Sequence, residues 1–396
     1  MMMGLENVYI VGMARTPIGK FGGSLKDWPA PKLGAVAIAS AIRRSGLDPE
    51  DIDEVIMGNA LQAFIGQNPA RQAGLLAGLP ASVPGYTVNK VCASAMKAVS
   101  LAAQSIALGE NKVIVAGGME SMSMAPYAIP SRWRWGVRFA FAGENIYDIM
   151  VHDGLTDPHT GLLMGEEAEA TGEKWGIKRE EADDFAVSSH LKAAEATERG
   201  YYAREIEPIK KGNDVILDRD EGIRPDTSLE KVARLKPVFK PGGTITAANA
   251  SQLSDGAAAL VLASRDVVEE KGLKPIARIL GFASASVEPK DFVEAPIPAT
   301  EKLLKMLGMS IEDFDLFEHN EAFALASLVV SKGLKIPLDK LNVFGGAVAI
   351  GHPLGASGAR ILVTLINALQ VKGGRRGLAT ICHGGGGAQS MAVEIV

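Results

Sequence analysis

Cysteine is nearly absent from this chain, which has two among its 396 residues, Cys92 and Cys382. Two cysteines cannot form a disulfide framework, and their wide separation lacks the Cys-x-x-Cys spacing of a zinc or redox-active site. The low content therefore indicates a reducing compartment. Residues 1–7 also lack the basic segment that opens a signal peptide, so we expect the protein in the cytoplasm.

Long apolar runs and an excess of positive charge are missing too. No run approaches the ~18 to 20 consecutive apolar residues that a membrane helix needs, so we expect no membrane partner. The formal net charge of −5 argues against nucleic acid as a partner, although a local basic cluster could meet the phosphates of a small ligand. With 47% hydrophobic and 22% charged residues, the chain is typical of a globular protein with one large core or several domains.

The first and last thirds of the chain alternate between segments that favour strands and segments that favour helices. This alternation predicts an α/β fold. The expected strands are residues 8–12, 54–58, 113–118, 276–281, 314–317 and 378–382. The expected helices are residues 33–44, 93–108, 297–307, 322–333 and 356–369.

Two stretches of the chain repeat one pattern, in which small residues lead into a long helix, a turn and a strand that ends in glycines. These stretches are residues 93–118 and 356–384. We infer a duplicated α/β unit, because two such halves facing each other bring the loop before each long helix to one shared seam. Ligands of α/β proteins usually bind at such loops.

A segment of different composition lies between the halves, at about residues 121–251. It is richer in charge, holds three of the four tryptophans and contains a predicted helix at residues 178–199. We expect this segment to be an insertion. It could be a surface cap that stabilises an oligomer or a lid over a long substrate, and one segment can do both.

Cys92 stands where a predicted helix begins, and the first turn of that helix consists almost entirely of small residues. Free N–H groups and the positive end of the helix dipole favour a thiolate there, so we expect the thiol pKa to fall below its ordinary value of about 8.5. Such a thiol suits a nucleophile. The alternative is a buried cysteine that packs as a small hydrophobic residue, and the helix-start context alone does not decide between them.

Three further residues could act with Cys92. His352 leads into the second repeat's helix as Cys92 leads into the first, so a thiolate and an imidazole can meet across the seam, although a lone loop histidine is often structural. Cys382 precedes four glycines, whose N–H groups can point at an oxygen anion or merely form a tight turn. Asn320 follows a predicted strand, where it can cap a helix, hold a water or donate to an oxyanion. Metal binding is the poorest alternative, because Cys382 and His383 have no third ligand.

Taken together, seven stretches resemble the motifs of the thiolase family, in the family's order and at its spacing over nearly the whole chain. The matching stretches are VNKVCASAMKA (residues 88–98), GGMESMS (117–123), NAS (249–251), DGAA (255–258), NEAF (320–323), GGAVAIGHPLGASGAR (345–360) and CHGGG (382–386). The resemblance implies two similar βαβαβαββ halves in five layers, α/β/α/β/α, with an inserted loop domain. We expect the N-terminal half at residues 1–121, completed by 252–273, the loop or lid domain at 122–251 and the C-terminal half at 274–396.

The resemblance also implies acetyl-CoA C-acyltransferase activity, the reversible Claisen condensation of acetyl-CoA with an acyl-CoA to a 3-ketoacyl-CoA, here most simply acetoacetyl-CoA. By family matching, Cys92 is acylated, His352 accepts its proton, and Cys382 moves a proton to or from C2 of acetyl-CoA. His352 and a water held by Asn320 would form one oxyanion site, and the backbone N–H groups of Cys92 and Gly384 would form a second.

No permanently bound cofactor is implied, and CoA, acetyl-CoA and 3-ketoacyl-CoA enter as substrates. The positions that match CoA contacts are Ser251 on the pantetheine, Phe239 and Met164 along its channel, and Arg224 near the nucleotide end. All four lie in or beside the inserted segment, which favours the lid over the cap. The family's habit also implies a homodimer or a homotetramer.

Departures from the family's pattern leave the acyl-chain length open. Leu163 stands where biosynthetic members typically have histidine, and Gln252 replaces a usual glycine. A degradative thiolase for longer chains is therefore one alternative. A decarboxylating ketoacyl synthase generally has histidine at the position of Asn320 and lacks Cys382, so the chain sides with thiolases. A catalytically silent acyl-CoA-binding or scaffolding protein tends to lose a reactive residue, whereas this chain keeps all of them.

Overall fold

The computed structural model describes residues 5–136 and 145–396. Residues 1–4, in the predicted N-terminal half, and residues 137–144, in the predicted inserted domain, lie outside this part. The strands of the described residues are β1 (Val8–Arg15), β2 (Gly19–Lys20), β3 (Glu54–Gly58), β4 (Gly85–Val88), β5 (Val113–Ser121), β6 (Tyr127–Ala128), β7 (Tyr147–Asp148), β8 (Ile209–Lys211), β9 (Asp214–Leu217), β10 (Ser254–Ser264), β11 (Ala277–Ser286), β12 (Leu316–His319), β13 (Arg376–His383) and β14 (Gly387–Ile395).

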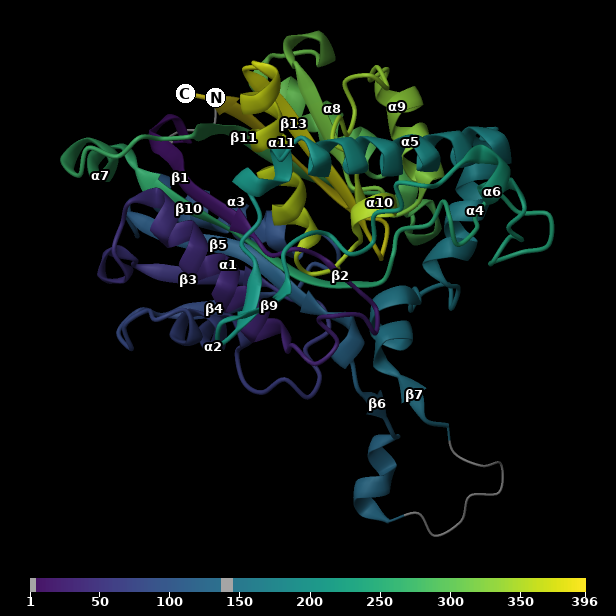
Figure 1. Ribbon diagram of the computed structural model, residues 1–396, viewed down its shortest axis with the longest axis horizontal. Coiled ribbons are helices and arrows are strands. Elements are labelled where there is room, and N and C mark those ends of the chain that lie inside the picture. Colours follow the sequence, from purple (N-terminus) through teal and green to yellow (C-terminus); the bar gives the residue numbers. More distant parts are fainter. Residues whose placement is uncertain (1–4, 137–144) are drawn as a thin grey trace.

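Helices alternate with these strands along the chain (Figure 1). The helices of the described residues are α1 (Ala30–Ser45), α2 (Pro69–Leu76), α3 (Ser94–Ala107), α4 (Met164–Lys174), α5 (Arg179–Glu198), α6 (Leu229–Ala233), α7 (Arg265–Glu270), α8 (Pro296–Leu307), α9 (Ala324–Leu334), α10 (Ala347–Ile350) and α11 (Ser357–Lys372). The predicted α/β fold is therefore confirmed. No helix within the described ranges is both long enough and apolar enough to cross a membrane.

Ten of these strands form one sheet with the order β12-β13-β14-β11-β1-β10-β5-β3-β4, in which β2 also pairs with β10. Its two halves repeat the same pairing. In the first, β1–β10 and β10–β5 are antiparallel, whereas β5–β3 is parallel. In the second, β11–β14 and β14–β13 are antiparallel, whereas β13–β12 is parallel. The duplication expected from the sequence is thus present in the topology, and a short β1–β11 contact joins the halves.

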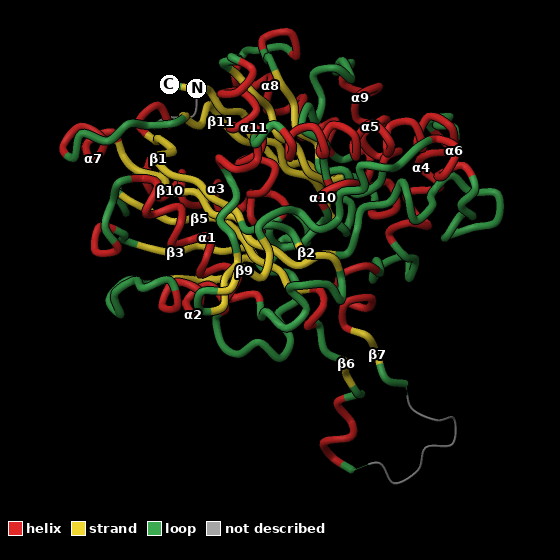
Figure 2. Tube along the Cα trace, in the orientation of Figure 1, coloured by secondary structure: helices red, strands yellow, loops and turns green. Residues whose placement is uncertain are grey.

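Helices cover the sheet halves in layers (Figures 1 and 2). α1 packs on β1, β10 and β5 from outside, and α8 packs on β11 and β14 from outside. Between the halves lie α3, which packs on β3 and β5, and α11, which packs on β12 and β13. The largest apolar cluster joins α3, α11 and both sheet halves, so the two helices form a buried central layer. This arrangement is the five-layer order that the sequence implied.

The segment between β5 and β10 is inserted into the first half and adds no strand to the 10-stranded sheet. It holds α4, α5 and α6, and the antiparallel pairs β6–β7 and β8–β9. The β6–β7 pair belongs to an arm that projects away from the body (Figure 1). We call residues 127–136 and 145–148 the aromatic arm, because Tyr127, Trp133, Trp135 and Tyr147 are exposed on it.

Most expected elements match the observed ones within a few residues, and the ends differ for identifiable reasons. Residues 54–58 coincide with β3. The strand expected at 8–12 continues to Arg15, because Arg15 is paired inside the core with Glu205 and Asp220. The helix expected from residue 93 begins at Ser94, so Cys92 lies in a turn and not in the helix.

Candidate active site

The turn that carries Cys92 is strained. It connects β4 to α3, and within it Val91 has φ +49°, a left-handed conformation that a β-branched residue adopts only where its surroundings enforce it. The side-chain oxygen of Asn89 accepts from the Val91 N–H at 3.0 Å, and the Ser94 hydroxyl donates to the Val91 carbonyl at 2.6 Å. These bonds hold the chain in a sharp reversal that keeps the half-buried Cys92 out of the helix.

Burial raises the pKa of the Cys92 thiol to about 12, and the negative charge of Glu120 adds to this effect. The backbone N–H groups of Gly384 and of Cys92 itself lower the pKa, but by less. The expectation of a lowered pKa is therefore wrong. Loss of hydration outweighs the dipole of a helix that begins two residues further on, so Cys92 is a protonated thiol at neutral pH and needs a base.

His352 can act as a base, because its imidazole is held neutral. Burial and the positive charge of Arg360 lower the pKa of His352 to about 3. The Ser357 hydroxyl donates to the Pro353 carbonyl at 2.9 Å, so it accepts at 2.6 Å from Nδ1 of His352. Nδ1 then carries the proton, and Nε2 is the unprotonated nitrogen that can accept one.

Asn320 lies beside Nε2 of His352. It directly follows β12, its backbone N–H donates to the Thr380 carbonyl at 3.1 Å, and its side-chain amide donates to Nε2 of His352 at 3.3 Å. Its other side-chain atom, Oδ1, is buried and has no hydrogen-bond partner among the described residues. The structure therefore brings Asn320 and His352 together and leaves an acceptor free for a water.

Cys382 and Gly384 lie at the turn between β13 and β14. Cys382 is buried and pairs with Ala388 across the two strands. Burial raises the pKa of its thiol, and charge on Cys92 raises it further. A Cβ on Gly384 would lie 3.9 Å from the side chain of Val91 in the Cys92 turn, and the Gly384 N–H lowers the pKa of the Cys92 thiol. Cys92 thus forms one group with Cys382 and Gly384, which lie 290 and 292 positions further along the chain.

Glycines allow the Cys92 and His352 loops to approach. A Cβ on Gly118 of β5 would lie 2.0 Å from the carbonyl oxygen of Gly355, and one on Gly358 would lie 2.5 Å from the backbone nitrogen of Met96. Gly355 and Gly358 belong to the loop and helix that follow His352, and Met96 belongs to the first turn of α3. Backbone therefore packs on backbone where the two central helices begin.

Glu120 joins the His352 loop to the loop that follows β3. Its buried carboxylate accepts from the backbone N–H groups of Ala60 and Gly355 at 2.9 Å each and from that of Leu61 at 3.2 Å. Burial raises the pKa of Glu120 to about 7, against the effect of these bonds. Glu120 and the Ser357 that orients His352 were not singled out from the sequence, although both lie inside matching motifs. Their roles depend on partners that are distant in the chain or on a hydroxyl whose direction only the fold sets.

Two of the four expected CoA contacts lie beside this group. Met164 begins α4, and its sulfur is 3.2 Å from the position that a Cβ on Gly384 would take. Phe239 lies against Gly165 and meets the ring of Phe323 edge to face, with 6.1 Å between centroids. Both side chains share an apolar cluster with Cys382. They therefore form an apolar wall next to the thiols.

The other two lie further out. The backbone N–H of Ser251 donates at 3.0 Å to the carbonyl of Ala322, two residues after Asn320, and Ser251 is half-buried. Arg224 is exposed, and its backbone N–H donates to Nδ1 of His190 at 3.0 Å. Ser251 is thus near the site through the chain segment after Asn320, and Arg224 is at the surface.

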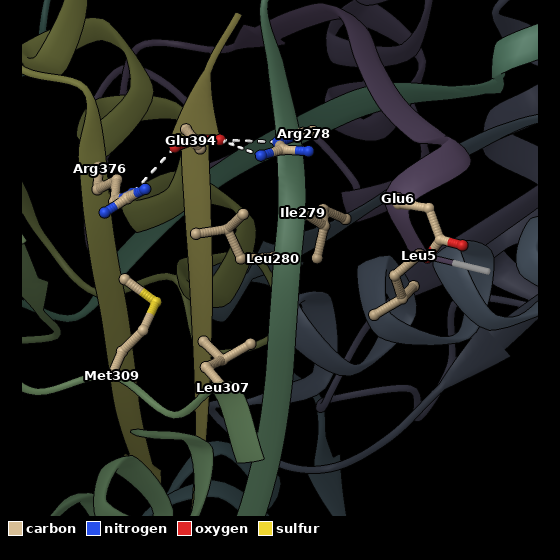
Figure 3. Close-up of a pocket in the computed structure, with 9 residues that line it drawn as sticks. All are labelled: Leu5, Glu6, Arg278, Ile279, Leu280, Leu307, Met309, Arg376 and Glu394. Atoms are coloured by element: carbon tan, nitrogen blue, oxygen red, sulfur yellow. Dashed lines mark hydrogen bonds and ion pairs between the residues drawn. The ribbon is translucent and has the colours of Figure 1, made fainter. Parts of the chain in front are cut away.

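Other candidate sites do not compete with this one. Within the described ranges, no group of three His, Cys, Asp or Glu side chains could hold a metal ion. A cavity of 270 Å³ is lined by Leu5, Leu307 and Met309 beside the ion-paired Arg376 and Glu394 (Figure 3). Arg376 begins β13, whereas Cys382 lies near its other end, so this cavity is separate from the two thiols.

Comparisons with known proteins agree with the sequence and the geometry. Residues 8–266 match the family model "Thiolase, N-terminal domain", and residues 273–395 match "Thiolase, C-terminal domain". An acetyl-CoA acetyltransferase of Synechocystis is 48% identical over 99% of this chain and 100% of its own length. The crystal structure of the Bacillus anthracis acetyl-CoA acetyltransferase has a TM-score of 0.95 at 44% identity, over 98% of this chain and 99% of that one. A thiolase from Ascaris suum, solved in complex with coenzyme A, has a TM-score of 0.93 at 43% identity, over 98% of this chain and 100% of that one.

Proposed function

Because the chain belongs to the thiolase family, we propose that it is an acetyl-CoA C-acyltransferase that cleaves and forms 3-ketoacyl-CoA through an acyl-cysteine. The family, fold and class of activity predicted from the motifs are confirmed. The observation that carries the proposal is the approach of the β13–β14 turn, with Cys382 and Gly384, to the Cys92 turn, where the Gly384 backbone lowers the pKa of the Cys92 thiol. The adjacent pair of Asn320 and His352 supports it.

In the first step, Nε2 of His352 takes the proton of the Cys92 thiol as the sulfur attacks C3 of 3-ketoacyl-CoA. The new C–S bond forms a tetrahedral oxyanion, for which the N–H groups of Cys92 and Gly384 are the donors. The C2–C3 bond then breaks, which leaves the acyl group on Cys92. Both N–H groups lower the pKa of the Cys92 thiol, which supports the assignment.

The electron pair of the broken bond goes to C2, next to the thioester of the departing acetyl-CoA. His352 and a water held by Asn320 stabilise the enolate oxygen, and the Cys382 thiol gives its proton to C2. The Cys382 thiolate then takes the proton of an incoming CoA thiol, whose sulfur attacks the acyl-Cys92. The His352 imidazolium returns its proton to the Cys92 sulfur as acyl-CoA leaves. Burial keeps the Cys382 thiol protonated, which fits its use as an acid.

The CoA substrates would reach the thiols along the inserted segment. Met164 and Phe239 would line the channel for pantetheine, Ser251 would contact it, and Arg224, which is exposed, would meet the phosphates of the nucleotide. The proposed division is an N-terminal half at 1–121 with 252–273, a lid domain at 122–251 and a C-terminal half at 274–396. Acetoacetyl-CoA is the proposed substrate, and longer 3-ketoacyl-CoAs are the alternative.

A homodimer or homotetramer is proposed as well, in the cytoplasm. β4 is an edge strand of the sheet, and unpaired edges recruit other strands. Next to it lies a groove of 580 Å³ whose lining includes Tyr86, Leu101, Leu108 and Phe282. The aromatic arm is a second exposed apolar surface. One such surface used as a subunit contact would give a homodimer, and both used together would give a homotetramer.

The test is thiolysis by the purified protein, measured as acetyl-CoA formed from CoA and a series of 3-ketoacyl-CoA chain lengths. We expect turnover that is highest with acetoacetyl-CoA. Cys92→Ser should abolish it, and iodoacetamide should label Cys92 far faster than Cys382. A catalytically silent acyl-CoA-binding protein would bind the thioesters without turnover, and equal labelling of the two thiols would contradict the role given to Cys92.

A further inference from the structure

Lys90 lies two residues before Cys92 and reaches across to the second half of the molecule. Its ammonium nitrogen donates to the Ser284 hydroxyl of β11 at 2.8 Å and to the side-chain oxygen of Gln389 of β14 at 3.1 Å. The residue is half-buried, and burial with the charge of Lys97 lowers the pKa of Lys90 to about 8. A lysine that gives up hydration in this way is held by its partners and is not a solvated surface residue.

Gln389 connects this bond to the reacting group. It lies opposite Ile381 on β13, the residue before Cys382. Its amide nitrogen donates to the Ser100 hydroxyl and, at 3.3 Å, to the Met96 carbonyl, both on α3. The strand pair that carries Cys382 and Gly384 is therefore joined to both ends of the Cys92 turn, through Lys90 before it and α3 after it.

The turn needs such an anchor because its own conformation is unfavourable. A left-handed β-branched residue persists only where surrounding contacts over-determine it. The bonds from Asn89 and Ser94 to Val91 lie within the turn, so they fix its shape but not its position relative to β13 and β14. The bonds of Lys90 fix that position.

We propose that Lys90 is a positioning residue, which holds the Cys92 turn against the β13–β14 pair and so sets the alignment of the Cys92 sulfur with the Gly384 N–H. The inference rests on the proposed function and adds to it a residue that touches neither substrate nor reacting atoms. A misplacement of about 1 Å at a reacting centre can cost ~10²-fold in rate. Lys90→Met should therefore lower kcat roughly 10-fold to 100-fold.

The split between kcat and KM separates positioning from a general defect. Lys90 bonds to Ser284 and Gln389 and not to the proposed CoA contacts, so KM for CoA should stay within about twofold in Lys90→Met. Lys90→Arg retains nitrogen donors and should recover most of kcat. Lys97→Met is the matched control, since it removes a neighbouring ammonium on α3, and its kcat should stay within about twofold of the unchanged protein.

Labelling of Cys92 by iodoacetamide is a second measurement that does not depend on turnover. Loss of the Gly384 N–H bond raises the thiol pKa, so Lys90→Met should label Cys92 several-fold more slowly, whereas Lys97→Met should not. Ser284→Ala removes one acceptor of the Lys90 ammonium at an exposed position, so it should lower kcat when introduced alone. Added to Lys90→Met, it should lower kcat no further. This milder variant serves if Lys90→Met does not fold.

Either of two results overturns the proposal: unchanged kcat and labelling in Lys90→Met, or an equal loss in Lys97→Met. Failure of the proposed function is distinguishable, because the unchanged protein would then turn over no 3-ketoacyl-CoA. In that case the labelling rates alone decide whether Lys90 positions Cys92.

Discussion

At the scale of single residues, the site contains a neutral thiol, Cys92, and a neutral imidazole, His352. In a thiolate–imidazolium pair both groups would be charged. Burial raises the pKa of Cys92 to about 12 and lowers that of His352 to about 3. The thiol is thus a weak nucleophile and the imidazole a weak base until substrate arrives. The transfer of the Cys92 proton to His352 must therefore accompany the attack of the sulfur on the substrate. Backbone donors such as the Gly384 N–H then stabilise the oxyanion as it forms.

The pH dependence of Cys92 acylation by acetyl-CoA follows from these shifts. His352 is unprotonated above a pH of about 4, and Cys92 stays protonated below about 11, so the acylation rate should be flat from a pH of about 5 to about 10. In His352→Ala, hydroxide must remove the proton, and the rate should rise about tenfold per pH unit. Mass spectrometry of the acyl-enzyme at timed intervals measures both. A bell-shaped profile centred between about 6 and 9 in the unchanged protein would contradict the neutral pair.

Cys382 should act only in proton transfer to carbon. Cys382→Ser should therefore retain partial acylation of Cys92 while it loses the exchange of the acetyl-CoA methyl protons, because a serine hydroxyl is a far weaker acid than a thiol. Deuterium uptake into acetyl-CoA, followed by NMR, measures the exchange. Unchanged exchange in this variant would remove Cys382 from the mechanism, and loss of acylation would assign it a different role.

At the scale of elements, the active site depends on how closely α3 and α11 approach. Gly118 and Gly358 replace side chains with backbone contacts where both helices begin. The Glu120 carboxylate then binds the N–H groups of Ala60, after β3, and of Gly355, after His352. Because Cys92 and His352 precede these contacts by a few residues, helix packing determines whether thiol and imidazole share one pocket.

Gly118→Ala tests this packing. Its Cβ would lie 2.0 Å from the Gly355 oxygen, so the two loops must separate, at a cost of ~1 to 3 kcal/mol in unfolding free energy together with a large loss of kcat. Gly74→Ala in α2 is the control, since its Cβ meets atoms no nearer than 3.4 Å, and its stability should change by less than ~1 kcal/mol. Urea unfolding and thiolysis rates measure the two effects. Equal behaviour of both variants would refute the importance of the close approach.

At the scale of the whole molecule, a buried ion network fastens the inserted segment to the layered body. Arg15 of β1 bonds to Glu205 at 2.6 Å and to both oxygens of Asp220 at 2.6 and 2.8 Å, with none of these side chains exposed. Glu205 also accepts from Thr364 and Asn367 of α11. The network joins the first sheet half, the inserted segment and the central helix layer.

Arg15→Met should therefore destabilise the whole protein. It leaves two buried carboxylates without their cation, which typically costs ~3 to 5 kcal/mol. Arg43→Met removes an exposed arginine, 61% accessible, from its pair with Glu207 and should cost no more than ~1 kcal/mol. Thermal unfolding of both variants at one pH provides the comparison. A loss in Arg15→Met as small as in Arg43→Met would show that the inserted segment is held by other contacts.

The sequence by itself determined the alternation of strands and helices, the duplication and the family, because each is written in local periodicity or in motifs of adjacent residues. Apolar runs in the sequence predict β3 and β13, the strand that contains Cys382, because strands in the middle of a covered sheet are buried on both faces. The loops with Cys92, His352, Asn320 and Cys382 were recognisable for the same reason. Their roles, and those of the CoA contacts, remain predictions.

Only the tertiary structure decided the protonation states and the anchors of the site. The Cys92 pKa was expected to fall because a helix start is a local feature, yet it rises because burial depends on neighbours that are distant in the chain. Glu120 and Lys90 acquire their partners across 235 and up to 299 positions of the chain. Hydration and long-range hydrogen bonds are properties of the folded surroundings, so no pattern of neighbouring residues encodes them directly.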